Sequence, residues 1–151
     1  MIRIYVDADG CPVKQEICKV AARCGVEAVF VANTWMRIGE GAGAKMVVVD
    51  GDFNAADDWI AGQAVANDIV ITADIPLAAR CLAKGAVVLD PRGGAFSENT
   101  IGQALATREL MSHLRDQGQV GGGPAPFEKR HRSRFLQRLD ETIQSALRKK
   151  P

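Results

Sequence analysis

The sequence predicts an α/β protein with a Rossmann-like, mostly parallel sheet of about five strands covered by helices. Short β-branched runs alternate with segments whose apolar residues recur at helical spacing, and glycine or proline separates them. A length of 151 residues and a hydrophobic fraction of 47% suit a single domain with one sizeable core. Strands that alternate with helices form parallel sheets that are buried on both faces.

Five short apolar runs, rich in valine and isoleucine, are the predicted strands. A helical segment follows each of them except the second, which a glycine-punctuated loop joins to the third. We therefore expect consecutive strands to run parallel. The predicted strands comprise residues 2–6, 26–31, 45–50, 68–72 and 86–90.

The predicted helices fill the intervals and continue to the end of the chain. Pro12 is expected in the first turn of the first helix, where its missing N–H costs nothing, and Gly25 is expected to end that helix. Ser97 has the character of an N-cap for a long helix. The predicted helices comprise residues 12–24, 55–67, 75–84, 98–116 and 133–147.

The distribution of charge and glycine separates a C-terminal extension from the body of the protein. Residues 1–116 form the predicted α/β domain, residues 117–126 a Gly/Pro linker, and residues 127–151 a basic helical segment. That segment carries eight basic side chains against three acidic ones, a mild indication of a polyanionic partner or simply a solvated helix face. We expect its helix to pack on the domain, because an isolated helix of this length is marginal.

Several classes of protein are excluded by what the sequence lacks. No apolar run approaches the roughly 18 residues of a membrane span, and no signal-peptide pattern is visible, so we expect a cytoplasmic protein without a membrane partner. The four cysteines show no CxxC pairing and are expected to be free thiols. Both histidines lie in the helical C-terminal part of the chain, outside the predicted strand edge, which gives little support to a Ser–His or Cys–His catalytic pair.

Aspartates follow the predicted strands at the edge where ligands bind in open parallel sheets. Asp7 and Asp9 follow the first strand, Asp74 follows the fourth, and Asp57 and Asp58 open the helix after the third. Carboxylates that converge in this way repel one another unless one is protonated or a cation binds. Oxygen ligands without a histidine or thiolate cluster suit Mg²⁺ or Mn²⁺, which can promote phosphodiester hydrolysis.

We assign candidate roles to these five acids as a set. Asp7, Asp57 or Asp58, and Asp74 are candidate metal ligands, and Asp9 could bind the metal or orient water. Each of them could instead be a helix cap or a turn residue, positions that aspartate favours. That alternative is most open for Asp9. The structural role is the one we assign to Asp52 and Asp68.

Four further residues are candidates for substrate binding at the same edge. Lys14 could meet a phosphate at the start of the first helix, or be an ordinary surface lysine. Asn33 and Thr34 could orient substrate or water, or satisfy the local backbone. Arg92, in "DPRGG", could clamp a phosphate where two glycines allow close backbone approach, or pair with Asp90 or Asp74.

Four stretches of the chain resemble a known family. They are "DADGCPVK", "DDWIAGQAVANDIVITADIPLA", "LDPRGGAFSENTIGQALATRELMSHLR" and "GGGPAPFEKRHRSRFLQRLD". In this order they resemble the YaiI/YqxD family of bacterial proteins, which has no established activity. The resemblance covers essentially the whole chain, with one departure: an acidic residue is expected where His131 stands.

That family is in turn similar to PIN-like nucleases, a more distant resemblance. PIN-like domains have an aspartate after the first strand, acids that open a central helix, and an (I/V)-T-x-D element after the fourth strand. The matching positions here are Asp7, Asp57 or Asp58, and Thr72 with Asp74. The resemblance implies a sheet ordered 3-2-1-4-5, a substrate-binding role for Thr72, and metal-dependent cleavage of RNA or DNA, with RNA the expected partner.

Two alternatives remain open. "VDADG" also resembles the first motif of haloacid-dehalogenase phosphatases, which implies Asp7 as a nucleophile, although the downstream spacing fits poorly and leaves Asp74 without a role. The other alternative is a non-catalytic nucleic-acid-binding or adaptor protein that uses the basic last helix. The aromatic residues form no ordered stripe along the sequence, so stacking on bases has no support at this level.

Overall fold

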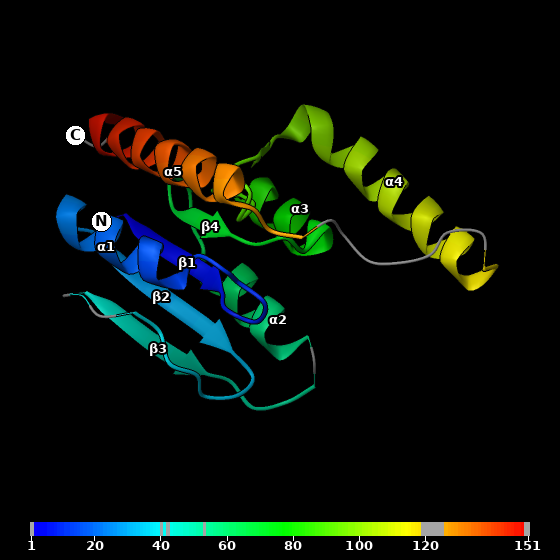
Figure 1. The fold of residues 1–151 in the computed structure, drawn as a ribbon, viewed down its shortest axis with the longest axis horizontal. Helices are drawn as coiled ribbons and strands as arrows, with labels where there is room; N and C mark the ends of the chain where they lie inside the picture. Colours follow the sequence, from blue (N-terminus) through cyan, green and yellow to red (C-terminus); the bar gives the residue numbers. More distant parts are fainter. Residues whose placement is uncertain (1, 40, 42, 53, 119–125, 150–151) are drawn as a thin grey trace.

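The structure is a computed structural model that describes residues 2–39, 41, 43–52, 54–118 and 126–149. Within this part of the chain, strands and helices alternate as predicted (Figure 1). In chain order the elements are β1 (Arg3–Asp7), α1 (Lys14–Cys24), β2 (Glu27–Ala32), β3 (Ala44–Val48), α2 (Ala55–Gln63), β4 (Ile69–Ile71), α3 (Ile75–Ala83), β5 (Val87–Leu89), β6 (Ala95–Phe96), α4 (Glu98–Asp116) and α5 (Lys129–Lys149).

The strands form one sheet in the order β3-β2-β1-β4-β5-β6. The first five are parallel, which confirms the predicted order, and β6 is added antiparallel to β5. The sequence did not predict β6, because a strand of two residues has no measurable alternation. β1 lies in the middle and pairs with both β2 and β4. The strand order reverses between β1 and β4, so the predicted ligand site lies at their carboxyl ends.

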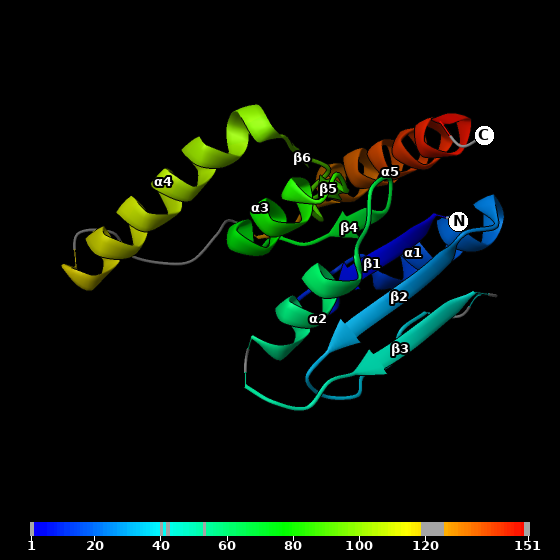
Figure 2. The same cartoon turned by 180° about the vertical axis from the view of Figure 1, so that it is seen from behind.

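Alternate residues of each strand enter different halves of the core. Ile4 and Val6 of β1 face the half covered by α1 and α5, and Tyr5 faces the half covered by α2 and α3. The two views of the ribbon show these pairs of helices on opposite faces of the sheet (Figures 1 and 2). Because both faces of the sheet are buried, the sequences of its central strands are continuous apolar runs.

Within residues 1–116, two helix ends differ from the prediction by two residues or more. α1 begins at Lys14, so Pro12 lies in the turn before the helix. α2 ends at Gln63, four residues early, because Ala64 is extended and a turn follows in which the Asp68 carboxylate accepts the Val65 N–H at 3.1 Å. The predicted end of α1 is confirmed: Gly25 adopts the left-handed conformation, at a φ of 70°.

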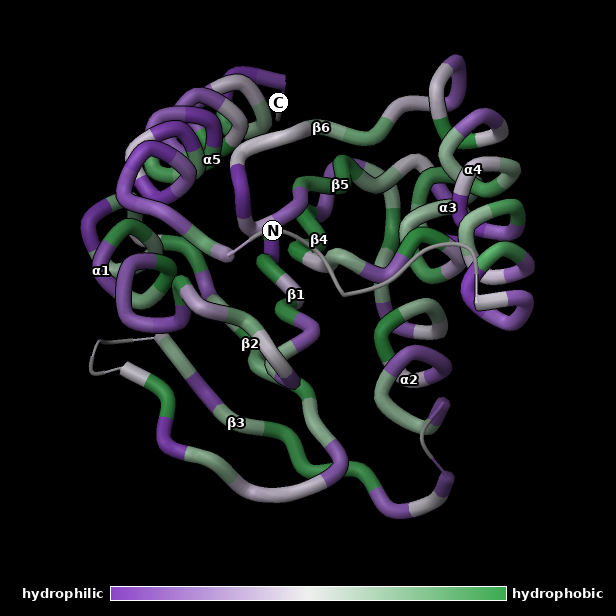
Figure 3. Tube along the Cα trace, turned by 45° about the vertical axis from the view of Figure 1, so that its right-hand side comes forward, coloured by the Kyte–Doolittle hydropathy of each residue, from purple (hydrophilic) through white to green (hydrophobic). Residues whose placement is uncertain are grey.

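The C-terminal helix α5 is part of the core. It begins at Lys129, four residues before the predicted start, and buries Phe135, Leu139 and Ile143 completely. Hydrophobic residues recur along its mostly hydrophilic tube (Figure 3). The buried face of the helix packs on the α/β domain. Residues 119–125 of the predicted linker lie outside the described residues.

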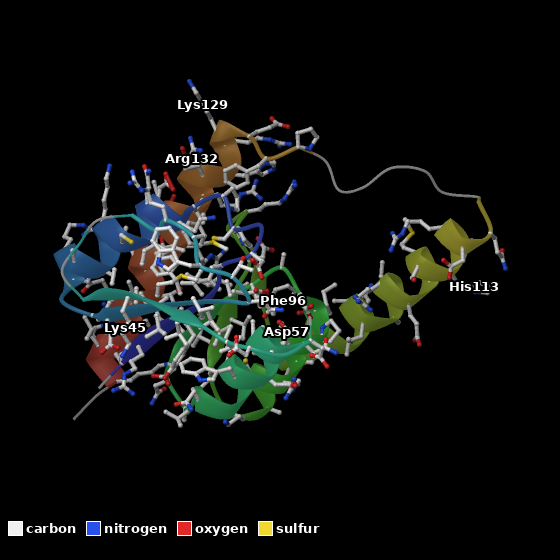
Figure 4. The ribbon with its side chains drawn as sticks, turned by 90° about the horizontal axis from the view of Figure 1, so that it is seen from below. Lys45, Asp57, Phe96, His113, Lys129 and Arg132 are labelled. Carbon is white, nitrogen blue, oxygen red and sulfur yellow. The ribbon has the colours of Figure 1, made fainter. Side chains whose placement is uncertain are left out.

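Helix α4 has the predicted bounds but little burial. Its N-terminus is fixed by a capping box, in which the Ser97 hydroxyl accepts the Thr100 N–H and the Thr100 hydroxyl accepts the Ser97 N–H. None of its residues is buried, and His113 lies on its outer part, away from the sheet (Figure 4). No helix in the described ranges is long and apolar enough to cross a membrane.

Candidate active site

Four of the five predicted carboxylates line one cavity at the carboxyl edge of the sheet. The cavity measures about 340 Å³ and lies beside the ends of β1 and β4. Asp7 and Asp9 come from the segment after β1, Asp57 from the first turn of α2, and Asp74 from the N-terminus of α3. We name this space the acidic cavity; its other lining residues are Asn54, Ala56, Pro76, Leu77, Arg80 and Arg108.

A buried threonine links two of these acids. The Thr72 hydroxyl donates to Asp7 Oδ2 at 2.9 Å and accepts the Asp74 N–H at 2.9 Å. Thr72 directly follows β4, and the pairing of β4 with β1 brings it to Asp7. The threonine thus holds one Asp7 oxygen in place and fixes the backbone at which α3 begins. Thr72 does not line the acidic cavity, so it affects the cavity only by positioning Asp7 and the start of α3.

Asp74 has a structural role as well as its place in the cavity. Its Oδ1 accepts the Leu77 N–H at 2.9 Å, which makes Asp74 the N-cap of α3. Asp9 behaves differently, because α1 has no side-chain cap and begins after Val13. The alternative role of Asp9 as a cap of α1 is therefore wrong. Asp9 is exposed and lines the acidic cavity.

The adjacent pair Asp57 and Asp58 separates into two environments. Asp57 lines the acidic cavity, whereas Asp58 Oδ1 lies 2.8 Å from a guanidinium nitrogen of Arg80 and is outside the lining. The sequence left open whether Asp57 or Asp58 is the candidate metal ligand. Asp57 is the one that lies with the other acids, and Asp58 orients an arginine of the cavity wall.

Burial and mutual repulsion raise the pKa values of two cavity carboxyls. Desolvation is the larger cause for Asp57, and the charges of Asp74 and Asp7 add to it, raising its pKa from 3.8 to about 6. Desolvation also raises the pKa of Asp7, and the Thr72 hydrogen bond partly opposes it. Arg80 lowers the pKa of Asp57 but does not cancel the combined effect of burial and carboxylate repulsion.

The side-chain positions do not by themselves enclose a cation. Among the described residues, no group of three or more His, Cys, Asp or Glu side chains is arranged so that it could hold a metal ion. The donor chemistry of the cavity nevertheless fits a hard cation, because its lining offers carboxylate oxygens and neither thiolate nor imidazole. The charges of Asp74 and Asp9 help to raise the pKa of Asp7, and those of Asp74 and Asp7 help to raise the pKa of Asp57.

Three predicted substrate-binding residues lie away from the acidic cavity. The Lys14 ammonium donates to the Cys11 carbonyl oxygen at 2.7 Å. The Asn33 amide donates to the Asp52 carbonyl oxygen at 2.9 Å, which ties the loops after β2 and β3 together. Thr34 is exposed on the first of these loops. None of the three lines the acidic cavity.

The "DPRGG" turn packs against α5. Its Asp90 carboxylate accepts the N–H groups of Arg92 at 2.7 Å and Gly94 at 3.2 Å. A Cβ at Gly93 would lie 2.8 Å from the backbone carbon of Arg134, so this glycine permits close approach of α5. Gly93 of this turn therefore allows close approach of α5, and not of a substrate phosphate as the sequence suggested. The Arg92 side chain lines a separate cavity.

The remaining acids and thiols have the structural roles expected of them. Asp68 is buried and accepts the Arg3 N–H at 3.1 Å, and Asp52 accepts the Asn54 N–H at 2.9 Å. All four cysteines are free, and Cys11 is buried, which raises the pKa of its thiol.

Two arginines of the acidic cavity were missed by the sequence analysis. Arg80 reaches the cavity from α3, and Arg108 reaches it from α4 because α4 lies beside α3. Neither belongs to a strand end or a recognisable motif, so the sequence carries no signal for them.

The fold and the cavity define an open α/β protein with clustered carboxylates where the strand order reverses. The chain belongs to the YaiI/YqxD family, since the model of the family described as "Uncharacterized BCR, YaiI/YqxD family" matches residues 5–145.

Curated relatives give the same family. A UPF0178 protein of Agrobacterium fabrum is 55% identical over 91% of this chain and 90% of its own length. A UPF0178 protein of Paramagnetospirillum magneticum is 50% identical over the full length of both chains, and one of Parvibaculum lavamentivorans is 51% identical over 100% of this chain and 99% of its own. No solved structure shows a significant match to the chain.

Proposed function

We propose that this protein is a divalent-metal-dependent nuclease that hydrolyses RNA phosphodiester bonds, as the resemblance to PIN-like nucleases suggested. The observation that carries the proposal is the convergence of Asp7, Asp9, Asp57 and Asp74 on one cavity at the switch point of the sheet. Asp7, Asp57 and Asp74 would hold Mg²⁺ or Mn²⁺. When bound, such an ion offsets phosphate charge and lowers the pKa of a bound water.

The side chains of the cavity have complementary tasks in this proposal. Thr72 holds Asp7 Oδ2 and leaves the other carboxylate oxygen of Asp7 for the cation. Asp9 is exposed at the cavity and is suited to orient the attacking water. Arg80 and Arg108 are the cationic residues of the lining, and we assign them to the phosphate oxygens. Asp58 holds Arg80 through their 2.8 Å ion pair.

Metal binding and RNA cleavage together test the proposal. We expect Mn²⁺ titration by calorimetry to show a site in the wild type that the Asp7→Asn/Asp74→Asn double variant loses. Each single variant should lose metal-dependent RNA cleavage while remaining folded. Asp50→Asn is the matched control, because Asp50 is an exposed aspartate after β3 that lies outside the acidic cavity. Full activity of Asp74→Asn would contradict the proposal.

The wild type and the double variant also distinguish the nuclease from the two alternative functions. A haloacid-dehalogenase-like phosphatase with Asp7 as nucleophile should hydrolyse phosphomonoesters and be inhibited by a beryllium fluoride mimic of aspartyl phosphate. A non-catalytic nucleic-acid-binding or adaptor protein should bind Mn²⁺ equally weakly in the wild type and the double variant. Its RNA binding should weaken with salt and with neutralisation of basic residues on α5.

A further inference from the structure

A second cavity adjoins the acidic cavity and has a different chemistry. It measures about 530 Å³, within the usual range for small-molecule sites, and we name it the aromatic cavity. Its walls come from the loop after β1, the segment between β4 and α3, the turn after β5, β6, and the residue pair before α5. The lining residues that bear on the inference are Gly10, Pro12, Ala73, Ile75, Phe96 and Phe127.

Two phenylalanine rings from distant parts of the chain meet this cavity. Phe96 lies on β6 and Phe127 lies just before α5, so 31 positions separate them, and the sequence showed no stacking stripe. Two side chains of α5 contact the Phe127 ring. The ring centroids of Phe127 and His131 are 5.6 Å apart, and the Arg132 guanidinium lies 5.7 Å from the Phe127 centroid. Both phenylalanines are only partly buried.

The lining of the aromatic cavity is connected to that of the acidic cavity and to that of a third, basic cavity. Gly10 and Ile75 in its wall directly follow Asp9 and Asp74 of the acidic cavity. Pro12 also lines a cavity of about 450 Å³ that contains Lys14, Arg37 and Arg132. Its single acid, Glu16, forms a 3.6 Å ion pair with Arg132. Lys14 comes from α1, Arg37 follows β2, and Arg132 comes from the first turns of α5, where Figure 4 labels it.

We propose that the aromatic cavity binds one base of a single-stranded nucleic acid. The base stacks on Phe96 and Phe127, one flanking phosphate meets Arg80 and Arg108 in the wall of the acidic cavity, and the other meets Lys14, Arg37 and Arg132. This inference rests on the proposed function and adds to it the substrate class, because a base in a duplex is not free to enter such a space. An apolar aromatic space with basic side chains in two neighbouring cavities is complementary to a base and its two flanking phosphates.

The test uses binding without catalysis. A ribotrinucleotide with 2-aminopurine at its centre is titrated with the full-length protein in EDTA, and quenching of its fluorescence reports stacking. We expect quenching by the wild type, with roughly 5- to 100-fold weaker binding and weaker quenching for Phe96→Leu and Phe127→Leu. Leucine keeps apolar contacts at both partly buried positions. Ala73→Phe, at an exposed alanine of the same wall, should block the cavity and have the same effect.

Two controls define the site. Trp35→Leu removes an aromatic ring that is 72% exposed and lies outside the cavity, so it should bind as the wild type does. Arg37→Gln should weaken binding and make its salt dependence shallower by about 0.7 in logarithmic slope, as expected for one phosphate contact on a single strand. Wild-type affinity and quenching in all three cavity variants would overturn the inference.

The outcomes distinguish this inference from the proposed function. Quenching that depends on Phe96 and Phe127, without any metal-dependent cleavage, supports the base site and contradicts the nuclease. Metal-dependent cleavage lost in Asp7→Asn, with binding indifferent to Phe96→Leu, Phe127→Leu and Ala73→Phe, supports the nuclease and overturns the base site. A duplex probe that binds as tightly as the trinucleotide also overturns it.

Discussion

The hydroxyl of Thr72 donates a 2.9 Å hydrogen bond to Asp7 Oδ2 across the junction of β4 and β1. The same oxygen of Thr72 accepts the Asp74 N–H, so one buried side chain orders both strand ends at the acidic cavity. A side chain with two partners of this kind can be tested by an isosteric change.

Thr72→Val keeps the volume and removes both hydrogen bonds. We expect the free energy of unfolding to fall by about 1–3 kcal/mol, since the Asp74 N–H then lacks its partner. The pKa of Asp7 should rise further, because the Thr72 hydrogen bond now opposes the effect of burial. Urea denaturation and carboxyl NMR titration measure the two effects. Thr72→Ser retains the hydroxyl and should lie closer to the wild type in both.

Asp74 should show separable structural and chemical roles. Asp74→Ala removes the cap on the Leu77 N–H and should cost about 1 kcal/mol of stability. Asp74→Asn keeps a capping oxygen and should be nearly as stable as the wild type, yet bind Mn²⁺ more weakly. Thermal denaturation with and without Mn²⁺ compares them. Equal loss of stability in both variants would show that the cap does not depend on the side-chain oxygen.

The raised pKa of Asp57 has a consequence for stability. Between about pH 4 and pH 6 the folded protein retains a proton on Asp57 that the unfolded chain has released. The contribution of this group to the free energy of unfolding therefore falls as pH rises through that interval.

Asp57→Asn removes this effect. In metal-free buffer at pH 7 we expect the variant to be more stable than the wild type by about 1 kcal/mol, a value reduced for solvent screening at this partly exposed site. The difference should vanish below about pH 4, where both side chains are neutral. Urea denaturation over pH 3.5–7.5 measures it, with Asp50→Asn as control. A difference independent of pH would contradict the assignment.

His131 completes the N-terminus of α5. Its Nδ1 accepts the Glu128 N–H at 2.9 Å, which is the bond that an acidic or amide side chain makes at the same position of a capping box. The acidic residue that the family resemblance led us to expect at this position can accept the same bond. Histidine thus replaces it with a different acceptor, and the ring also packs on Phe127.

Substitution of His131 should separate the hydrogen bond from the ring contact. His131→Ala loses both and should lower the free energy of unfolding by about 1–2 kcal/mol. His131→Gln and His131→Glu keep an acceptor and should recover most of the loss in urea denaturation. If both remain as unstable as His131→Ala, the ring contact and not the cap accounts for the effect.

Much of the fold could be predicted from the sequence because local patterns encode it. Apolar runs with β-branched residues define β1 to β5, and the helical spacing of Phe135, Leu139 and Ile143 predicts a packed face on α5. Helix and strand ends were less certain, since the starts of α1 and α5 and the end of α2 depend on turns beyond the periodic residues. The short β6 forms only because β5 is there to pair with it.

The candidate site divides in the same way. The sequence determined that Asp7, Asp9, Asp57 and Asp74 gather at one edge, because the carboxyl ends of parallel strands share that edge whatever the details of packing. Only the tertiary structure decided that Asp57 rather than Asp58 faces the other acids, and that Arg80 and Arg108 join them. It also decided that Phe96 and Phe127 meet in one cavity, since contacts between distant segments depend on how helices pack and leave no period in the sequence.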